Sequence, residues 1–236
     1  MIKEAIDRIL ALAVIQRLQV GNREYADRPL TAIKPPRQSE LTVSTLSAIE
    51  DYFRDNPDTV GLDKAIIHIR SAAHVDVMSP VADEWLQRDD YLTAKIEHKR
   101  FPFGKYLSIE EFMIAIQSYF VQDVTTDALL KVVGNLSDDT SVKYEDDGVT
   151  QVVQAKVGIA KIGNISLPNP VMLAPYRTFL DVEQPASAFV FRLKKHDSGP
   201  LAMLEEADGG NWNVECIKRV RDHLRVILPA GTVILA

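Results

Sequence analysis

The sequence predicts an α+β protein in which mixed or antiparallel sheets combine with several amphipathic helices, the first of them on a tether. Three observations support this fold class. Apolar residues recur every three or four positions near the beginning, the middle and the end of the chain, which indicates helices. Between these segments apolar and polar residues alternate, which indicates strands. A proline-containing stretch without apolar periodicity separates the first helix from the rest.

The first forty residues predict a helix followed by a linker. Residues 1–20 carry an apolar stripe along one helical face. Its members are Ile2, Ile6, Ile9, Leu10, Ala13 and Leu18. Residues 21–40 contain three prolines and no apolar period, so they predict an extended linker. The remainder, residues 41–236, is predicted to form a single α+β domain.

In the first part of this domain, residues 44–134, the sequence predicts helices on either side of short strands. Ser44 can cap a helix that ends near Pro57. Alternation in residues 64–77 then predicts a pair of strands, and a further strand is expected at 91–96. Ser108 begins a capping box, which predicts the start of a third helix. A shorter helix is expected to follow and to end at Gly134, because glycine readily ends helices.

The second half of the domain is rich in strand patterns. Asp147-Gly148 is a pair that tight hairpin turns favour. Helical spacing returns from Val214 and continues to Leu228, where Pro229 ends it, and a last strand is predicted at 232–235. The other predicted strands are 149–157, 189–193 and 201–204.

Composition limits the classes of function. With 27 Lys and Arg against 33 Asp and Glu, the formal charge is −6, which excludes a strongly basic coat for nucleic acid but not a local basic patch. A single cysteine, Cys216, is typical of a reducing compartment, so we expect a cytoplasmic protein. The apolar run near the N-terminus is interrupted by charges and falls short of the ~20 residues that span a bilayer. No membrane association is expected.

Several short motifs occur in a familiar order. They are Phe101-Pro102-Phe103-Gly104 before Glu110-Glu111-Phe112, then Asp147-Gly148-Val149, Pro168-Asn169-Pro170-Val171, Pro175-Tyr176-Arg177-Thr178-Phe179 and Ala207-Asp208-Gly209-Gly210. Over residues 41–228 the chain resembles an uncharacterised family of phage and prophage proteins, the YfdQ-like domain of unknown function. The resemblance implies a phage or prophage origin and action inside a bacterial host cell. It implies no reaction and no functional residues.

The usual sequence signs of catalysis are missing. The chain has neither a G-x-S-x-G nucleophile motif nor a glycine-rich phosphate loop, so we expect no cofactor. Cys216 lies at the edge of an apolar helical stripe and is predicted to be a packing residue. A hairpin centred near Ser71 and Ala72 would place His68 and His74 on opposite sides of the sheet, so no metal site is predicted.

The strongest polar signal is basic. Lys218, Arg221 and Arg225 fall within one sector of the last predicted helix. Lys194 and Lys195 lie in the turn before it. Arg177 lies between aromatic residues, on which a guanidinium can stack. One interpretation is a solvated helix flank that pairs with nearby carboxylates. The other is a binding site for phosphate or an acidic partner.

Together these observations predict a non-enzymatic phage or prophage accessory protein that acts by binding and by homo-oligomerisation. Its partner would be either another protein or, weakly, nucleic acid. We expect the N-terminal helix to provide the contact between subunits, although packing on its own domain is the alternative. The contact residues would be Ile2, Ile6, Ile9, Leu10 and Ala13. The alternative function is nucleic-acid binding in phage replication or recombination, with weak affinity, through the basic residues. An enzyme is the third possibility.

Overall fold

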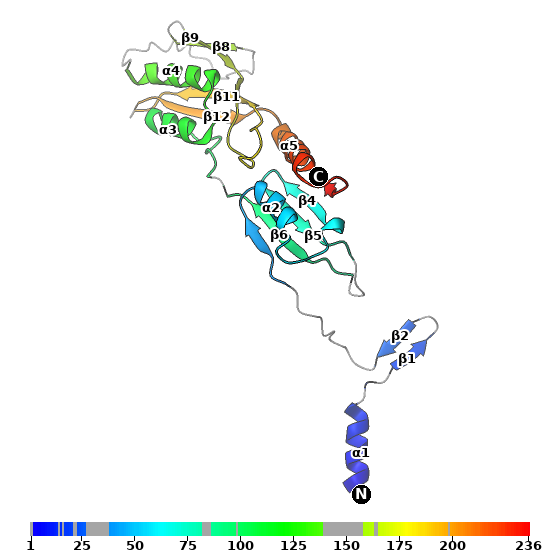
Figure 1. Ribbon diagram of the computed structural model, residues 1–236. Helices are drawn as coiled ribbons and strands as arrows, with labels where there is room; N and C mark the ends of the chain where they lie inside the picture. Colours follow the sequence, from blue (N-terminus) through cyan, green and yellow to red (C-terminus); the bar gives the residue numbers. More distant parts are fainter. Residues whose placement is uncertain are drawn as a thin grey trace. The chain divides into compact units, whose positions relative to one another are not determined.

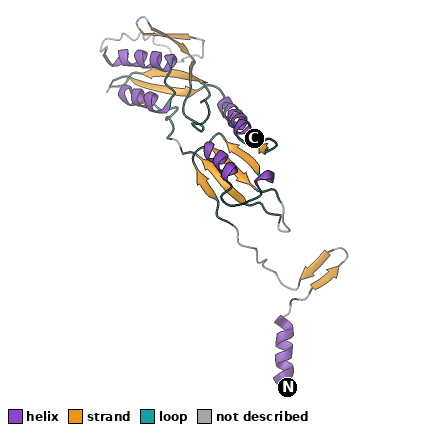
Figure 2. Ribbon diagram, viewed as in Figure 1, coloured by secondary structure: helices purple, strands orange, loops and turns teal. Residues whose placement is uncertain are grey.

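A computed structural model of the chain confirms an α+β fold with mixed and antiparallel sheets (Figures 1 and 2). The structure divides into two compact units, residues 1–37 and 38–236. The second unit begins close to the boundary that the sequence predicts. The structure describes residues 2–13, 15, 17–20, 23–26, 38–81, 86–97, 99–138, 158–162, 165–197 and 199–236.

The N-terminal unit contains a shorter helix than predicted. Helix α1 (Ile2–Ala13) is followed by strands β1 (Arg17–Val20) and β2 (Arg23–Ala26), which form an antiparallel hairpin. The prediction that the helix extends to residue 20 is therefore wrong, as is a linker that begins at 21. Residues 17–20 alternate polar and apolar side chains, a strand pattern. The next two residues in the sequence are Gly-Asn, a pair typical of hairpins.

One sheet of the second unit is mixed. Its strand order is β13-β4-β5-β6-β3, where β13 pairs with β4 and β3 pairs with β6 in parallel. Helices α2 and α5 pack on the face that carries Ile67, Val75 and Leu92. The elements are β3 (Leu41–Val43), α2 (Ser47–Asp55), the short 3-10 helix η1 (Leu62–Lys64), β4 (Ile66–Ser71), β5 (His74–Met78), β6 (Asp90–Lys95), α5 (Asn211–Ile227) and β13 (Val233–Leu235).

The other sheet is antiparallel, with the order β10-β11-β12-β7. A core of phenylalanine rings joins it to α3 and α4, and the rings of Phe101, Phe120 and Phe189 are fully or nearly fully buried. The pair β8 and β9 forms a separate hairpin. The elements are β7 (Leu107–Ser108), α3 (Ile109–Tyr119), α4 (Val124–Asp138), β8 (Gly158–Ile162), β9 (Ile165–Asn169), β10 (Val171–Leu173), β11 (Ser187–Lys194) and β12 (Leu201–Glu206).

Several element predictions can be compared with these bounds. The hairpin of β4 and β5, the long helix α5 and the capping box of Ser108 at the start of α3 are confirmed. The predicted end of a helix at Gly134 is wrong, because α4 continues to Asp138. A Cβ on Gly134 would lie 3.8 Å from Met113 Cε, so this glycine lies beside α3 within the helix. The predicted strand at 149–157 lies outside the described residues.

Residues 174–184, which we call the connecting segment, join the two cores. Pro175 forms a β-bridge with Phe120 beside the antiparallel sheet. Thr178 Oγ1 donates to Ala72 O at 2.5 Å, and Phe179 is buried in the core of the mixed sheet. The Gln184 side chain accepts from the N–H groups of Arg177 and Thr178 at 2.9 and 3.1 Å. The segment is therefore fixed along its length by backbone and side-chain bonds.

The connecting segment also caps helix α2. Ser44 was the predicted cap, and this prediction is wrong: Thr45 Oγ1 accepts from Ala48 N at 3.3 Å. The carboxylate of Asp181 accepts from Leu46 N and Ser47 N, each at 3.1 Å. Burial pushes the pKa of Asp181 upward, but hydrogen bonds to the carboxylate, led by these two, together outweigh burial and hold the pKa below its ordinary value. A distant carboxylate thus satisfies N–H groups that the helix cannot.

We expect Asp181→Ala to lower the free energy of unfolding by about 1–2 kcal/mol at neutral pH, because it leaves two backbone N–H groups without an acceptor. A lowered pKa stabilises the folded state only above the pKa of the unfolded carboxyl, ~3.9. The difference in unfolding free energy between the variant and the parent should therefore be constant from neutral pH to about 5 and should shrink below ~4. Urea unfolding at several pH values measures this. Glu183→Ala, at an exposed neighbour, is the control, and an equal effect there would contradict the prediction.

Candidate anion-binding site

Arg177 lies at the point where the connecting segment passes the antiparallel sheet and the start of α5. Its side chain is only 5% exposed. The guanidinium carbon lies 4.4 Å from the ring centroid of Trp212, 5.1 Å from that of Phe189 and 5.3 Å from that of Phe103. Three rings thus surround one cation, an arrangement that offsets part of the cost of removing the charge from water. The sequence predicts an aromatic setting for Arg177, and the structure has one. The three rings that surround the guanidinium are distant in sequence, however, and are not the flanking Tyr176 and Phe179.

The two terminal nitrogens of Arg177 differ in their polar partners. Nη2 lies 2.9 Å from Glu206 Oε1 and is ion-paired with it. Nη1 is buried and has no hydrogen-bond partner among the described residues. Burial lowers the pKa of Arg177, while the carboxylates of Glu206 and Asp208 act in the opposite direction. A guanidinium stays charged at neutral pH, so the buried Nη1 donor is available to an acceptor from outside.

A cavity of about 130 Å³ opens beside this guanidinium. Its walls combine the aromatic side chains of Tyr119, Tyr176 and Trp212 with the guanidinium groups of Arg100 and Arg177. Glu206 is the acidic residue of the lining, so positive charge is in excess there. At ~30 Å³ for each water, the volume holds about four waters. This space and charge suit a phosphate, sulfate or carboxylate group.

A second, larger cavity of about 340 Å³ shares two walls with the first. Tyr119 and Tyr176 line both cavities. Lys99, Ser118 and Leu180 complete the lining of the larger one. Its volume falls within the ~300–1,000 Å³ of small-molecule sites. The two tyrosines therefore stand between a small cationic cavity and a wider one.

The other predicted basic residues lie elsewhere. At roughly 100° per residue, Lys218, Arg221 and Arg225 lie about 180–240° around α5 from Trp212, away from Arg177. Arg221 Nε is 3.2 Å and Arg225 Nη1 is 3.7 Å from Asp222 Oδ1. These contacts support the interpretation of an ion-paired helix flank for two of the three residues. The structure does not bring this stripe together with Arg177.

Lys194 and Lys195 are exposed at the end of β11 and just beyond it. The Lys194 ammonium lies 5.6 Å from the ring centroid of Tyr106. Five residues of strand at ~3.3 Å each place Lys194 roughly 16 Å from Phe189, which contacts Arg177. The two lysines therefore do not belong to the Arg177 cavity.

Cys216 lies under the same helix turn as Trp212 and is fully buried, in line with the packing role that the sequence predicts. Burial raises the pKa of the Cys216 thiol to about 11, although Arg177 and Arg219 act in the opposite direction. The thiol is therefore neutral at physiological pH. Because the thiolate is the reactive form, this environment suppresses its reactivity.

We expect Cys216 to react with a thiol reagent at pH 7 roughly 300-fold more slowly in the folded protein than in denaturant, where thiols titrate near ~8.5. Raising the pH from 7 toward 10 should speed native labelling about tenfold per unit, because the thiolate fraction grows in that proportion. Mass spectrometry of labelled protein measures both rates. Native labelling as fast as labelling in denaturant would show the thiol to be activated.

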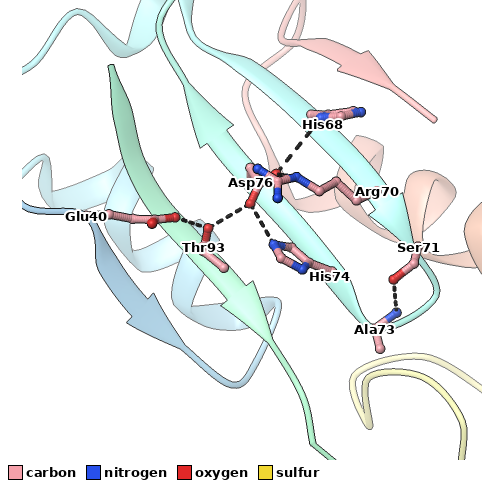
Figure 3. Close-up of polar contacts among 8 residues, drawn as sticks. All are labelled: Glu40, His68, Arg70, Ser71, Ala73, His74, Asp76 and Thr93. Carbon is pink, nitrogen blue, oxygen red and sulfur yellow. Dashed lines mark hydrogen bonds and ion pairs between the residues drawn. The ribbon is translucent and has the colours of Figure 1, made fainter. Parts of the chain in front are cut away.

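Sequence reasoning missed a polar cluster on the mixed sheet (Figure 3). The register pairs His68 with Asp76, and a bulge between Ile69 and Ser71 shifts the turn. His68 and His74 therefore lie on the same side as Asp76, and the prediction of opposite sides is wrong. Asp76 is 1% exposed. The bulge explains why His68 and His74 share a side, because it adds one residue to one strand and shifts the register by one.

Neighbours on three strands contact the Asp76 carboxylate (Figure 3), with hydrogen bonds to Oδ1 and ion pairs to Oδ2. His74 Nε2 lies 2.9 Å from Asp76 Oδ1, and Thr93 Oγ1 donates to the same oxygen at 2.7 Å. Arg70 Nε forms an ion pair with Oδ2, and His68 Nδ1 lies 3.9 Å from it. Among the residues that the structure describes, no group of three or more His, Cys, Asp or Glu side chains is arranged to hold a metal ion. The cluster thus serves as internal charge pairing.

Compared with known proteins, the chain matches no family model, no curated protein sequence and no solved structure. In the described part of the chain, none of the helices combines the length and apolar character needed to cross a membrane.

Proposed function

We propose that this is a non-enzymatic binding protein whose recognition site is the Arg177 cavity. One observation carries the proposal: a charged guanidinium, buried and with no hydrogen-bond partner at Nη1, lines an open cavity. Leaving this donor unsatisfied costs free energy, and an oxyanion in the cavity would accept from it. Serine, cysteine, threonine and histidine are absent from the described residues that line this cavity, which supports binding without a side-chain nucleophile of those types.

The order of motifs in residues 41–228 resembles the phage and prophage family, and we propose an accessory role of that kind in the cytoplasm of a bacterial host. We also propose self-association through α1. Within the N-terminal unit, Ile2 is 80% and Ile6 is 51% exposed. The side chains of Ile9, Leu10 and Ala13 lie outside the described residues. An isolated helix of 12 residues is marginal in water unless its apolar face is covered.

Titration calorimetry with sodium phosphate and sodium sulfate tests the recognition site. Both oxyanions should bind with a measurable heat, and sodium chloride at equal ionic strength should not. Absence of binding by any oxyanion would overturn the proposed site. A separate observation favours the alternative function, nucleic-acid binding: Tyr119 and Tyr176 line both the Arg177 cavity and the larger cavity, and bases stack on aromatic rings.

A further inference from the structure

We propose that the two adjoining cavities form a site for single-stranded nucleic acid, in which one phosphate enters the Arg177 cavity and one base stacks in the larger cavity. This inference rests on the proposed anion site and adds its ligand class. It replaces the basic stripe of α5 as the place of nucleic-acid contact. Cavity size, a fixed aromatic pair and cations in both cavities support it.

The smaller cavity has a size that suits a phosphate, and the larger cavity has a size that suits a base. The Arg177 cavity, about 130 Å³ and lined by two arginines, has room for a single anionic group. The larger cavity, about 340 Å³, accepts a flat heterocycle. Because Tyr119 and Tyr176 line both, a ligand that fills the two cavities passes along these two rings. An anionic group joined to a flat ring is the chemistry of a nucleotide.

The tyrosine pair is held in place by the backbone. Tyr176 N donates to Tyr119 O at 2.9 Å, and Val121 N donates to Ala174 O at 2.8 Å. Between them lies the bridge of Phe120 with Pro175. The backbone therefore holds the two tyrosines at adjacent positions before a ligand binds. Aromatic rings are the usual stacking platform for unpaired bases.

Cationic residues line each of the two cavities. Lys99 lines the larger cavity, and Arg100 and Arg177 line the smaller one. Lys99 and Arg100 are exposed and have no ion-pair partner among the described residues. A free mononucleotide has phosphate on one side of its base, whereas a strand continues to a further phosphate. Cations in both cavities, which share two tyrosines, therefore fit a strand.

A duplex does not fit the same site. Stacking a base against Tyr119 or Tyr176 requires that the base be unpaired and turned out of its own stack. The protein's net charge of −6 also disfavours the extensive phosphate contact on which nonspecific duplex binding depends. A local site with one phosphate pocket and one stacking pocket selects single strands.

Fluorescence anisotropy with a short labelled oligothymidine tests the proposal on the full chain. Tyr119→Ala and Tyr176→Ala should each weaken binding roughly 5- to 150-fold, because each removes a stacking ring. Tyr119→Phe and Tyr176→Phe keep the ring and should restore most of the affinity. Tyr106→Ala, at an exposed ring outside both cavities, is the matched control and should leave affinity unchanged. Thermal melting verifies that every variant is folded.

A charge-matched pair of double variants locates the phosphate contacts. Lys99→Ala with Arg100→Ala should weaken binding and flatten its dependence on salt, because fewer counterions are released. Lys218→Ala with Arg225→Ala removes the same charge from the α5 stripe and should have the smaller effect. The reverse order would overturn the proposal in favour of the stripe.

The remaining outcomes separate this inference from the anion site itself. Equal affinity for a matched duplex, or for thymidine monophosphate and the oligonucleotide, would overturn the single-strand assignment. Phosphate binding in calorimetry without oligonucleotide binding would overturn this inference and leave the anion site standing. Loss of both would overturn both.

Discussion

Replacing Arg177 by methionine is expected to reduce oxyanion affinity by two orders of magnitude or more without destabilising the fold. Hydrogen bonds to charged groups contribute about 1.5–3 kcal/mol each, and this variant loses both the Nη1 donor and the positive charge that attracts the anion. Methionine keeps an unbranched apolar chain between the rings of Phe103, Phe189 and Trp212. Calorimetry with phosphate and urea unfolding measure the two properties separately.

The expected stability change distinguishes a binding role from a structural one. Removing a charge from water costs free energy, and deleting one partner of an ion pair is strongly destabilising only when the other charge stays buried and unpaired. Glu206, the partner left behind, has a side chain that is 40% exposed and can be hydrated. We therefore expect the unfolding free energy of Arg177→Met to equal or exceed that of the parent. A structural arginine would give the opposite sign.

Two further variants complete this test. Arg177→Lys keeps a charge but not the two-pronged donor and should show intermediate affinity. Arg192→Met, at an exposed position on β11, controls for loss of charge and should change neither property. Retained phosphate affinity in Arg177→Met, together with a loss of more than about 2 kcal/mol of stability, would contradict the binding role.

Local sequence signals predicted most of the helices and strands. The capping box of Ser108 and the hairpin of β4 and β5 depend on residues close together in sequence, so period and capping chemistry suffice to find them. The bulge in that hairpin was not predictable, because the extra residue is placed by the packing of neighbouring strands. One residue of register decided whether His68 and His74 share a face.

The candidate site was only partly predictable for the same reason. Arg177 was singled out because aromatic residues flank it in sequence, yet Phe179 turns into the core of the other sheet. The rings that enclose the guanidinium come from other segments, at Phe103, Phe189 and Trp212. Their convergence depends on how the connecting segment crosses between two cores. No local pattern encodes such a crossing, although the Phe101-to-Gly104 motif was a visible signal.

The second large effect is expected at α1. Replacing Ile2 and Ile6 together by glutamate should convert an oligomer into single chains of 26.4 kDa, measured by light scattering. Full burial of each isoleucine contributes about 1.5–3 kcal/mol. Losing two of them per subunit should therefore raise the dissociation constant of the oligomer more than about a hundredfold. The charged side chains would also need to be removed from water at the interface.

The hairpin beside α1 leads to the same expectation. Leu18 pairs with Tyr25 across β1 and β2, yet the two side chains are 64% and 50% exposed. A two-stranded hairpin is marginal in water without a covered apolar face. A second copy of the unit offers a matching apolar surface by symmetry. Asp7→Lys, an exposed change in the same helix, should leave the mass unchanged. A monomeric parent, or an unchanged mass in the double variant, would show that α1 packs within its own chain or elsewhere.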